Sequence, residues 1–232
     1  GSLGVYLKGT SKVFAHLKSL AADIVFLQET HIKPTRANLL KCRWVNQIFQ
    51  STFSSKARRV AILISKSIPF RHVSTICDPN GRFLLVTGHI YTHHVTLLNI
   101  YGPNFDNPNF FSKVFDLLPN LSDTNVIVGG DFNCVIDNYL DRSSQPTQLP
   151  SAASATVNNL MLSTHLVDIW RLQHPTDKDY SFFSQRHKSY SRIDYFLLDS
   201  NLISNVISTK YHNILISDHS PTSLVLDLNH MK

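Results

Sequence analysis

The sequence predicts an α/β protein in which β-sheets pack face to face and helices cover them. Most apolar residues fall in strand-length runs bounded by turn residues, such as the segment DPNGR at 78–82. Hydrophobic residues make up 43% of the 232 residues, which is enough for a full core. Because no segment has the composition of a linker and no internal repeat is visible, we expect a single domain over residues 1–232.

The predicted elements are short strands with few helices between them. A helix is expected over residues 11–22, because its apolar residues share one face and Ser11 can cap its N-terminus. A similar stripe predicts a helix within residues 151–166, and a third is expected over 109–118. The expected strands cover residues 23–27, 59–65, 82–90, 95–101, 126–130, 192–198 and 222–228.

The charge is positive and unevenly placed. There are 22 Lys and Arg against 16 Asp and Glu, which leaves a net charge of +6. No acidic residue lies between Glu29 and Asp78, and a second acid-free window at 180–193 combines basic and aromatic residues. A solvated basic surface explains this pattern most simply, but so long a window without a carboxylate favours contact with nucleic-acid phosphates.

Cysteine usage and hydropathy exclude several classes of protein. The three cysteines, Cys42, Cys77 and Cys134, are far apart and odd in number, so neither a disulfide framework nor a cysteine zinc site is expected. This usage favours a reducing, intracellular setting. The longest apolar runs have the length of a strand, and the first residues lack an apolar signal segment, so we expect no membrane partner.

Polar side chains follow or interrupt several predicted strands, where scaffolds often place functional groups. The run VIVGG (126–130) leads directly into Asp131 and Asn133. An ordinary polar turn explains this segment equally well, because Gly, Asp and Asn are the usual turn residues. The other polar groups placed in this way are Glu29, Tyr101, Asp194, Asp218 and His219.

Some of these residues match the needs of metal-assisted phosphodiester hydrolysis. Glu29 offers a hard oxygen ligand for Mg²⁺, and Asp218 is a second carboxylate for the same region. Asp131 can orient an attacking water or take its proton, and Asn133 can hold that water or a phosphoryl oxygen. Each residue also has a structural explanation; Glu29, for example, can be a helix cap or a surface acid.

His219 and Asp194 complete this inventory. His219 can hydrogen-bond to a phosphate oxygen if an acid such as Asp194 fixes its tautomer and favours the imidazolium. Alternatively, Asp194 forms an ion pair with Arg192, and His219 is a turn residue. The sequence contains no Ser-His-Asp elbow, P-loop or GxGxxG motif that would indicate a competing chemistry.

The order of the motifs resembles that of the exonuclease–endonuclease–phosphatase superfamily, which includes apurinic/apyrimidinic endonucleases, deoxyribonuclease I and inositol polyphosphate 5-phosphatases. The motifs are QET (28–30), NIYGPN (99–104), GGDFN (129–133), SRIDYFLL (191–198) and SDHSP (217–221). The resemblance extends over residues 11–228. It implies a four-layered α/β sandwich, with two packed, mostly antiparallel sheets flanked by helices.

Within that superfamily, the chain most resembles the endonuclease domain of LINE-type (non-LTR) retrotransposons. The resemblance is carried by QETH (28–31), NIYGPN, LDRS (140–143) and YSFFS (180–184) followed by YSRIDYFLL (190–198). It implies a Mg²⁺-dependent enzyme, with Mn²⁺ as a substitute ion, that nicks double-stranded chromosomal DNA in the nucleus. The 3′ hydroxyl at the nick then primes reverse transcription by a fused reverse transcriptase domain.

The same resemblance implies roles for individual residues. It assigns Glu29 and Asp218 to the metal, Asp131 and Asn133 to the nucleophile, Tyr101 to the scissile phosphate, and Asp194 to the support of His219. The division of proton transfer between Asp131 and His219 stays open. Residues 184–192 are expected to form a hairpin that contacts a DNA groove. The residues expected on the DNA side are Arg58, Arg59, Arg142, Ser181, Arg186, Lys188 and Arg192.

One departure from the family pattern concerns the N-terminus. Family members open with an apolar strand that ends in an Asn-x-Asn-Gly-like turn, whose first Asn lies by the metal and the phosphate. This chain begins with GSLGV (1–5), so we expect that strand and its Asn to be missing. An incomplete metal site, an exposed sheet edge and weakened activity would follow.

Two alternative functions use the same residues. An abasic-site repair endonuclease would share the chemistry, and a catalytically impaired DNA-binding module would follow from an incomplete metal site. An inositide phosphatase is less favoured, because no feature of the sequence indicates a headgroup pocket.

Overall fold

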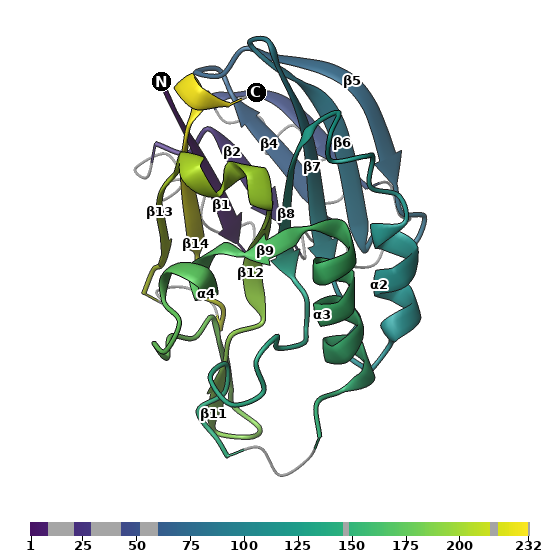
Figure 1. The fold of residues 1–232 in the computed structure, drawn as a ribbon, viewed down its shortest axis with the longest axis vertical. Coiled ribbons are helices and arrows are strands. Elements are labelled where there is room, and N and C mark those ends of the chain that lie inside the picture. Colours follow the sequence, from purple (N-terminus) through teal and green to yellow (C-terminus); the bar gives the residue numbers. More distant parts are fainter. Residues whose placement is uncertain (9–20, 29–42, 52–59, 146–148, 214–217, 232) are drawn as a thin grey trace.

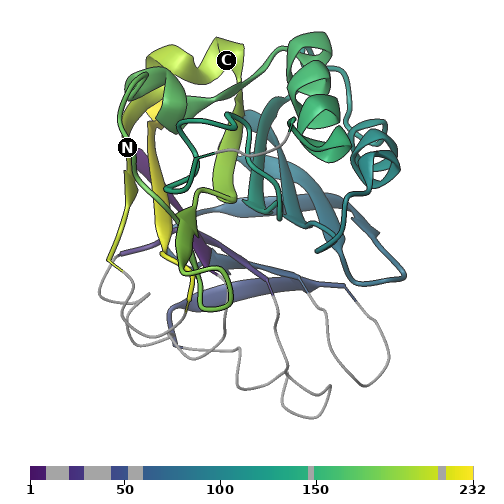
Figure 2. The same ribbon diagram turned by 90° about the horizontal axis from the view of Figure 1, so that it is seen from below.

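The computed structural model describes the chain except residues 9–20, 29–42, 52–59, 146–148, 214–217 and 232. Within the described residues, two six-stranded sheets face one another, and helices cover the outer face of one of them (Figures 1 and 2). This is the α/β sandwich that the sequence predicts. The helix predicted over residues 11–22 lies almost wholly outside the described residues.

The first sheet contains both terminal regions of the chain. In spatial order its strands are β13 (Val206–Tyr211), β14 (Thr222–Asp227), β1 (Ser2–Lys8), β2 (Ile24–Leu27), β4 (Ala61–Ser65) and β3 (Val45–Gln50). β1 pairs antiparallel with β14 and parallel with β2. The N-terminal and C-terminal strands therefore lie side by side inside the sheet.

The prediction of a missing first strand and an exposed sheet edge is wrong. Residues 2–8 form β1, which lies inside the sheet, while β13 and β3 form its edges. Leu3, Val5 and Leu7 are all fully or almost fully buried. The prediction took the absent turn motif as evidence for an absent strand, whereas the alternation of these apolar residues is itself a strand pattern. The absence of the turn Asn, and its effect on activity, stay a prediction.

The second sheet carries most of the polar residues at strand ends. In spatial order its strands are β5 (Phe70–Cys77), β6 (Phe83–Ile90), β7 (His93–Tyr101), β8 (Asn125–Asp131), β12 (Asp194–Asp199) and β9 (Leu166–Asp168). β7 and β8 are parallel, and β12 is antiparallel to β8. The C-terminal ends of β7 and β8 therefore lie beside the N-terminal end of β12.

Helices α2 (Pro108–Phe115) and α3 (Ala152–Thr164) pack on the outer face of the second sheet (Figure 2). The side chains of Asn107 and Ser151 cap their N-termini by accepting backbone N–H groups. A short helix α4 (Ile169–Gln173) follows β9, and two 3₁₀ helices cover Ser200–Asn205 and Leu228–His230. Among the described residues, none of the helices combines the length and the hydropathy of a membrane span.

Buried hydrogen bonds from side chains of the QET and NIYGPN motifs join the two sheets. The Asn99 side-chain amide donates to the carbonyls of Leu27 and Ala61, both at 2.9 Å. Gln28 donates in turn to the Asn99 side-chain oxygen at 2.7 Å. Both side chains are buried. Gln28 of QET and Asn99 of NIYGPN thus hold β7 against β2 and β4, so these motif residues have a structural role that the sequence alone did not indicate.

Candidate active site

Strand register alone places three of the predicted site residues in one row. Tyr101 at the end of β7 pairs with Asp131 at the end of β8, and Asp131 pairs with Asp194 at the start of β12. Residues paired directly across neighbouring strands carry their side chains on the same face of the sheet. The pairing therefore brings two carboxylates, 63 residues apart in sequence, to one position at the end of the sheet.

The last two residues of β8 are a glycine that no other residue can replace and the candidate acid Asp131. Gly130 has φ +149°, and a Cβ there would lie 1.9 Å from the Ile100 carbonyl oxygen, so a larger residue cannot fit. The Asp131 carboxylate accepts the backbone N–H of Asn133 at 2.9 Å, and Asn133 is left-handed with φ 52°. The Asn133 amide donates to the Gly102 carbonyl at 2.7 Å. A tight turn is thus the device that holds Asp131 at the site.

Arg82 holds the loop at Tyr101 and Gly102 in place, a role that the sequence does not indicate. Its guanidinium donates to the Gly102 carbonyl at 3.0 Å and lies 5.2 Å from the centre of the Tyr101 ring. The Arg82 carbonyl also accepts the N–H of Tyr101 at 2.7 Å. Arg82 stands in the segment DPNGR, whose composition indicates only a turn.

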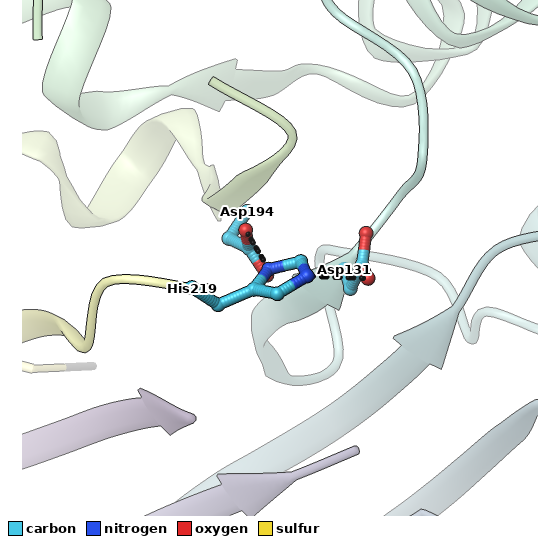
Figure 3. Close-up of side chains that lie close together, drawn as sticks. All are labelled: Asp131, Asp194 and His219. Carbon is cyan, nitrogen blue, oxygen red and sulfur yellow. Dashed lines mark hydrogen bonds and ion pairs between the residues drawn. The ribbon is translucent and has the colours of Figure 1, made fainter. Parts of the chain in front are cut away.

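His219 lies between the two carboxylates (Figure 3). Its Nδ1 is 2.7 Å from Asp194 Oδ2, and its Nε2 is 3.8 Å from Asp131 Oδ2. Both acids are buried, and the His219 side chain is only 15% exposed. The predicted support of His219 by Asp194 agrees with this geometry, because the short bond to Nδ1 orients the ring and turns Nε2 toward Asp131.

The electrostatics of the site favour a protonated His219. Burial lowers the pKa of this imidazole, but the Asp194 charge, its hydrogen bond and then the charges of Asp131 and Asp218 outweigh burial and raise the pKa to about 10. At neutral pH the ring is therefore an imidazolium whose two nitrogens both donate. A cation held in this position can hydrogen-bond to a negatively charged phosphate oxygen.

The same residues also form a candidate metal group. One ligand atom from each of Asp131, Asp194 and His219 lies within 4.8 Å of the others. However, a histidine binds a metal only as the neutral imidazole, so an ion there would have to displace a strongly held proton. The carboxylate oxygens suit Mg²⁺, whereas the bound proton disfavours His219 as a metal ligand. Asp218 is exposed beside His219, and Glu29 lies outside the described residues.

A hairpin is fastened to the loop that carries His219. It consists of β10 (Phe182–Ser184) and β11 (Ser189–Ser191). The Phe182 ring lies 4.8 Å from the His219 ring. The backbone N–H of Phe183 donates to the backbone carbonyl of Asp218 at 3.1 Å, and that of Ser220 donates to the backbone carbonyl of Ser181 at 2.6 Å. The hairpin predicted over residues 184–192 therefore exists, although it begins two residues earlier.

The tip of the hairpin carries exposed basic residues. Arg186 and Lys188 are exposed between the two strands, and Lys188 has φ 48°. Figure 1 places the hairpin at the lower end of the molecule, and Figure 2 looks onto that end. Arg142 is partly buried and donates to Asn138 at 3.3 Å. Arg58 and Arg59 lie outside the described residues.

Arg192 is not available to DNA, so its predicted role is wrong. Its side chain is fully buried and forms ion pairs with Asp141 at 2.8 Å and with Asp168. The rings of Trp170 and Tyr195 flank the guanidinium at 5.3 and 5.4 Å. The alternative of an Arg192–Asp194 ion pair is not what the structure shows, because Arg192 has these other partners and Asp194 bonds to His219.

Ser181 is likewise structural rather than a surface residue facing DNA. Its side chain is fully buried, and its Oγ accepts the backbone N–H groups of Ile193 at 3.0 Å and of Asp194 at 2.9 Å. A short polar residue suits this position, because two converging N–H groups need one small acceptor. Ser181 thus helps to position Asp194 and makes no direct contact outside the protein.

The chain is similar in sequence to known proteins. Residues 7–219 match the model of the Endonuclease/Exonuclease/phosphatase family. A Xenopus laevis protein, described as a transposon TX1 uncharacterized 149 kDa protein, is 27% identical over 222 residues, which are 94% of this chain and 17% of that protein.

Solved structures share the fold. An AP endonuclease from Leishmania major superposes with a TM-score of 0.76 at 17% identity, over 97% of this chain and 88% of that one. An AP endonuclease from Archaeoglobus fulgidus gives 0.74 at 18% identity, over 97% and 100%. A 3′ phosphatase from Neisseria bound to a product DNA hairpin gives 0.72 at 19%, over 97% and 99%. From the family match over most of its length, the chain belongs to the Endonuclease/Exonuclease/phosphatase family.

Proposed function

We propose that this chain is a metal-dependent endonuclease that nicks double-stranded DNA by phosphodiester hydrolysis. The observation that carries the proposal is that His219 lies between Asp131 and Asp194 at the end of the second sheet, next to a basic hairpin. A buried carboxylate beside a buried imidazolium provides both a proton acceptor for water and a hydrogen-bond donor for a phosphate.

The mechanism assigns one task to each residue. Asp131 orients a water molecule and accepts its proton as the water oxygen attacks the phosphorus. His219 donates a hydrogen bond from Nε2 to a phosphoryl oxygen, and Asp194 holds the ring through Nδ1. Asn133 holds the turn and the water, and Tyr101 contacts the phosphate. As the bond between the water oxygen and the phosphorus forms, the P–O3′ bond breaks and the leaving O3′ takes a proton from bulk water, which leaves a 3′ hydroxyl and a 5′ phosphate.

Mg²⁺ is the expected cofactor, and Mn²⁺ should substitute for it. When bound, it would supply Lewis-acid stabilisation of the charge that develops on the phosphate. Glu29 and Asp218 are the residues that would hold it, since few carboxylates and several waters suit this ion.

The biological role that we propose is target-primed reverse transcription in the nucleus. Support comes from the transposon relative, of whose length this chain spans only 17%. A longer protein of this kind has room for a reverse transcriptase domain, which would extend the 3′ hydroxyl that the nick creates.

The test is conversion of supercoiled plasmid to the open circle, with Mg²⁺ and with a chelator. We expect nicking only with the metal, and comparable cleavage of an intact AT-rich duplex and an abasic duplex. Strong preference for the abasic duplex would favour the repair endonuclease instead. Binding of DNA without any metal-stimulated cleavage would favour the catalytically impaired DNA-binding module and refute the proposal.

The hairpin tip should increase the affinity for DNA rather than the rate of nicking. Replacing both Arg186 and Lys188 with Ala removes two phosphate contacts, so we expect weaker DNA binding and a salt dependence whose slope falls by about 2. The measurement is binding of a labelled duplex at several salt concentrations. The control is Lys113→Ala, an exposed lysine on α2; an equal loss in this variant would show that general charge, and not the hairpin, is responsible.

A further inference from the structure

The backbone of Asp194 is held at both of its polar groups by side chains from other segments. Ser181 accepts its N–H, as described above. The hydroxyl of Tyr211 donates to its carbonyl oxygen at 2.6 Å. Asp194 is the first residue of β12, where the strand ladder begins. These two side chains therefore fix the position of the Asp194 backbone, from which the carboxylate that orients His219 extends.

Tyr211 connects the two sheets at the active site. It is the last residue of β13, in the first sheet, whereas Asp194 belongs to the second sheet. Its neighbour His212 donates its backbone N–H to the Pro221 carbonyl at 2.8 Å, two residues beyond His219. One short segment thus contacts the backbone of Asp194 and the backbone two residues beyond His219.

Tyr211 is itself held by a buried network. Arg192 Nη1 donates to the Tyr211 hydroxyl oxygen at 3.4 Å, and the Trp170 ring meets the Tyr211 ring edge-on at 5.3 Å. Donation from a cation to the hydroxyl oxygen polarises the O–H bond and strengthens its donation to Asp194. Burial also raises the pKa of this hydroxyl, so that it stays a donor at neutral pH.

We propose that Tyr211 is a positioning residue of the active site: its hydroxyl sets the backbone of Asp194 and, through Asp194, the orientation of the His219 ring. The proposal rests on the proposed function of His219. Small displacements of a catalytic group lower rates without affecting substrate binding. Tyr211 acts on His219 only through Asp194 and does not itself contact the substrate. Loss of the Tyr211 hydroxyl should therefore lower kcat and leave KM unchanged.

The variant Tyr211→Phe removes the hydroxyl and keeps the ring. With supercoiled plasmid and Mg²⁺, we expect kcat to fall about five- to tenfold, as for loss of one hydrogen bond, while KM changes less than about twofold. The matched control is Thr209→Val on the same strand, since the buried Thr209 hydroxyl has no hydrogen-bond partner among the described residues. This control should keep the wild-type kcat.

A second readout does not depend on activity. In the proton NMR spectrum of the wild type, the His219 Nδ1–H that bonds to Asp194 should give a downfield signal, assigned by its loss in His219→Ala. We expect Tyr211→Phe to shift or broaden this signal and Thr209→Val to leave it unchanged. A wild-type kcat together with an unchanged signal in Tyr211→Phe would overturn the proposal. An equal loss of kcat in Thr209→Val would also overturn it. If the wild type shows no nicking, the proposed function fails, and the NMR signal alone decides whether Tyr211 positions His219.

Discussion

Replacing His219 with Ala is expected to lower the rate of plasmid nicking by about 10³- to 10⁴-fold. The substitution removes the hydrogen-bond donor to the phosphate and leaves Asp131 and Asp194 facing one another without the cation between them. Asp131→Ala should have an effect of the same size, because it removes the acceptor of the water proton. The rate of conversion of supercoiled plasmid in the presence of Mg²⁺ measures both effects.

Two controls separate chemistry from folding in this experiment. The circular dichroism spectra of both variants should match the wild type. His93→Ala changes a histidine at the opposite end of β7 from Tyr101 and should nick at the wild-type rate. Substantial residual nicking by His219→Ala or Asp131→Ala would contradict the mechanism.

Replacing Arg192 with Ala should destabilise the fold by about 3–5 kcal/mol, because it leaves the buried Asp168 carboxylate without its ion-pair partner and the buried Asp141 carboxylate with Arg171 alone. Asp141 and Asp168 are both almost fully buried and both bind the Arg192 guanidinium. Urea unfolding measures the difference in the free energy of unfolding. Lys188→Ala, an exposed change in the nearby hairpin, should stay within about 0.5 kcal/mol of the wild type. A similarly small effect of Arg192→Ala would show that the network contributes little to stability.

The same variant should also change how stability depends on pH. Burial raises the pKa of Asp141, but the charge and hydrogen bonds of Arg192 outweigh this, and the net pKa is lowered. A carboxyl whose folded pKa is depressed stabilises the protein above its unfolded pKa of about 3.9, and this contribution disappears as the pH falls through the folded value. The difference between wild type and Arg192→Ala should therefore be largest at neutral pH and shrink below about pH 4. A difference that is independent of pH would contradict this account of Asp141.

Local patterns predicted the strands and helices that carry strong signals. The apolar runs that became β7, β8 and β12 and the amphipathic stripe that became α3 lie where the sequence places them. β5 was missed because most of its residues are exposed on both faces, so it lacks the alternation of a half-buried strand. β1 differs from the prediction for another reason: the turn motif of the family is absent, but the alternating apolar residues of the strand itself are present.

The motifs identify some residues of the candidate site correctly, whereas the roles of others depend on burial. The motifs named Asp131, Asp194 and His219, because their residue types and order are visible in the chain. The family resemblance also suggested Ser181 as a DNA contact, and the acid-free basic window at 180–193 suggested Arg192. Burial reversed that assignment, and burial depends on which distant segments pack around a residue.

The sequence by itself determined which residue types follow each strand, how the turn after β8 is built, and the excess of basic residues. These properties depend on chemical identity and on neighbours a few positions away. Only the tertiary structure decided that Asp131 lies opposite Asp194, that Arg192 is held by Asp141 and Asp168, and that Tyr211 reaches the Asp194 carbonyl. Each of these contacts joins residues 17 or more positions apart, so each arises from the pairing of strands and the packing of sheets, which no local pattern specifies.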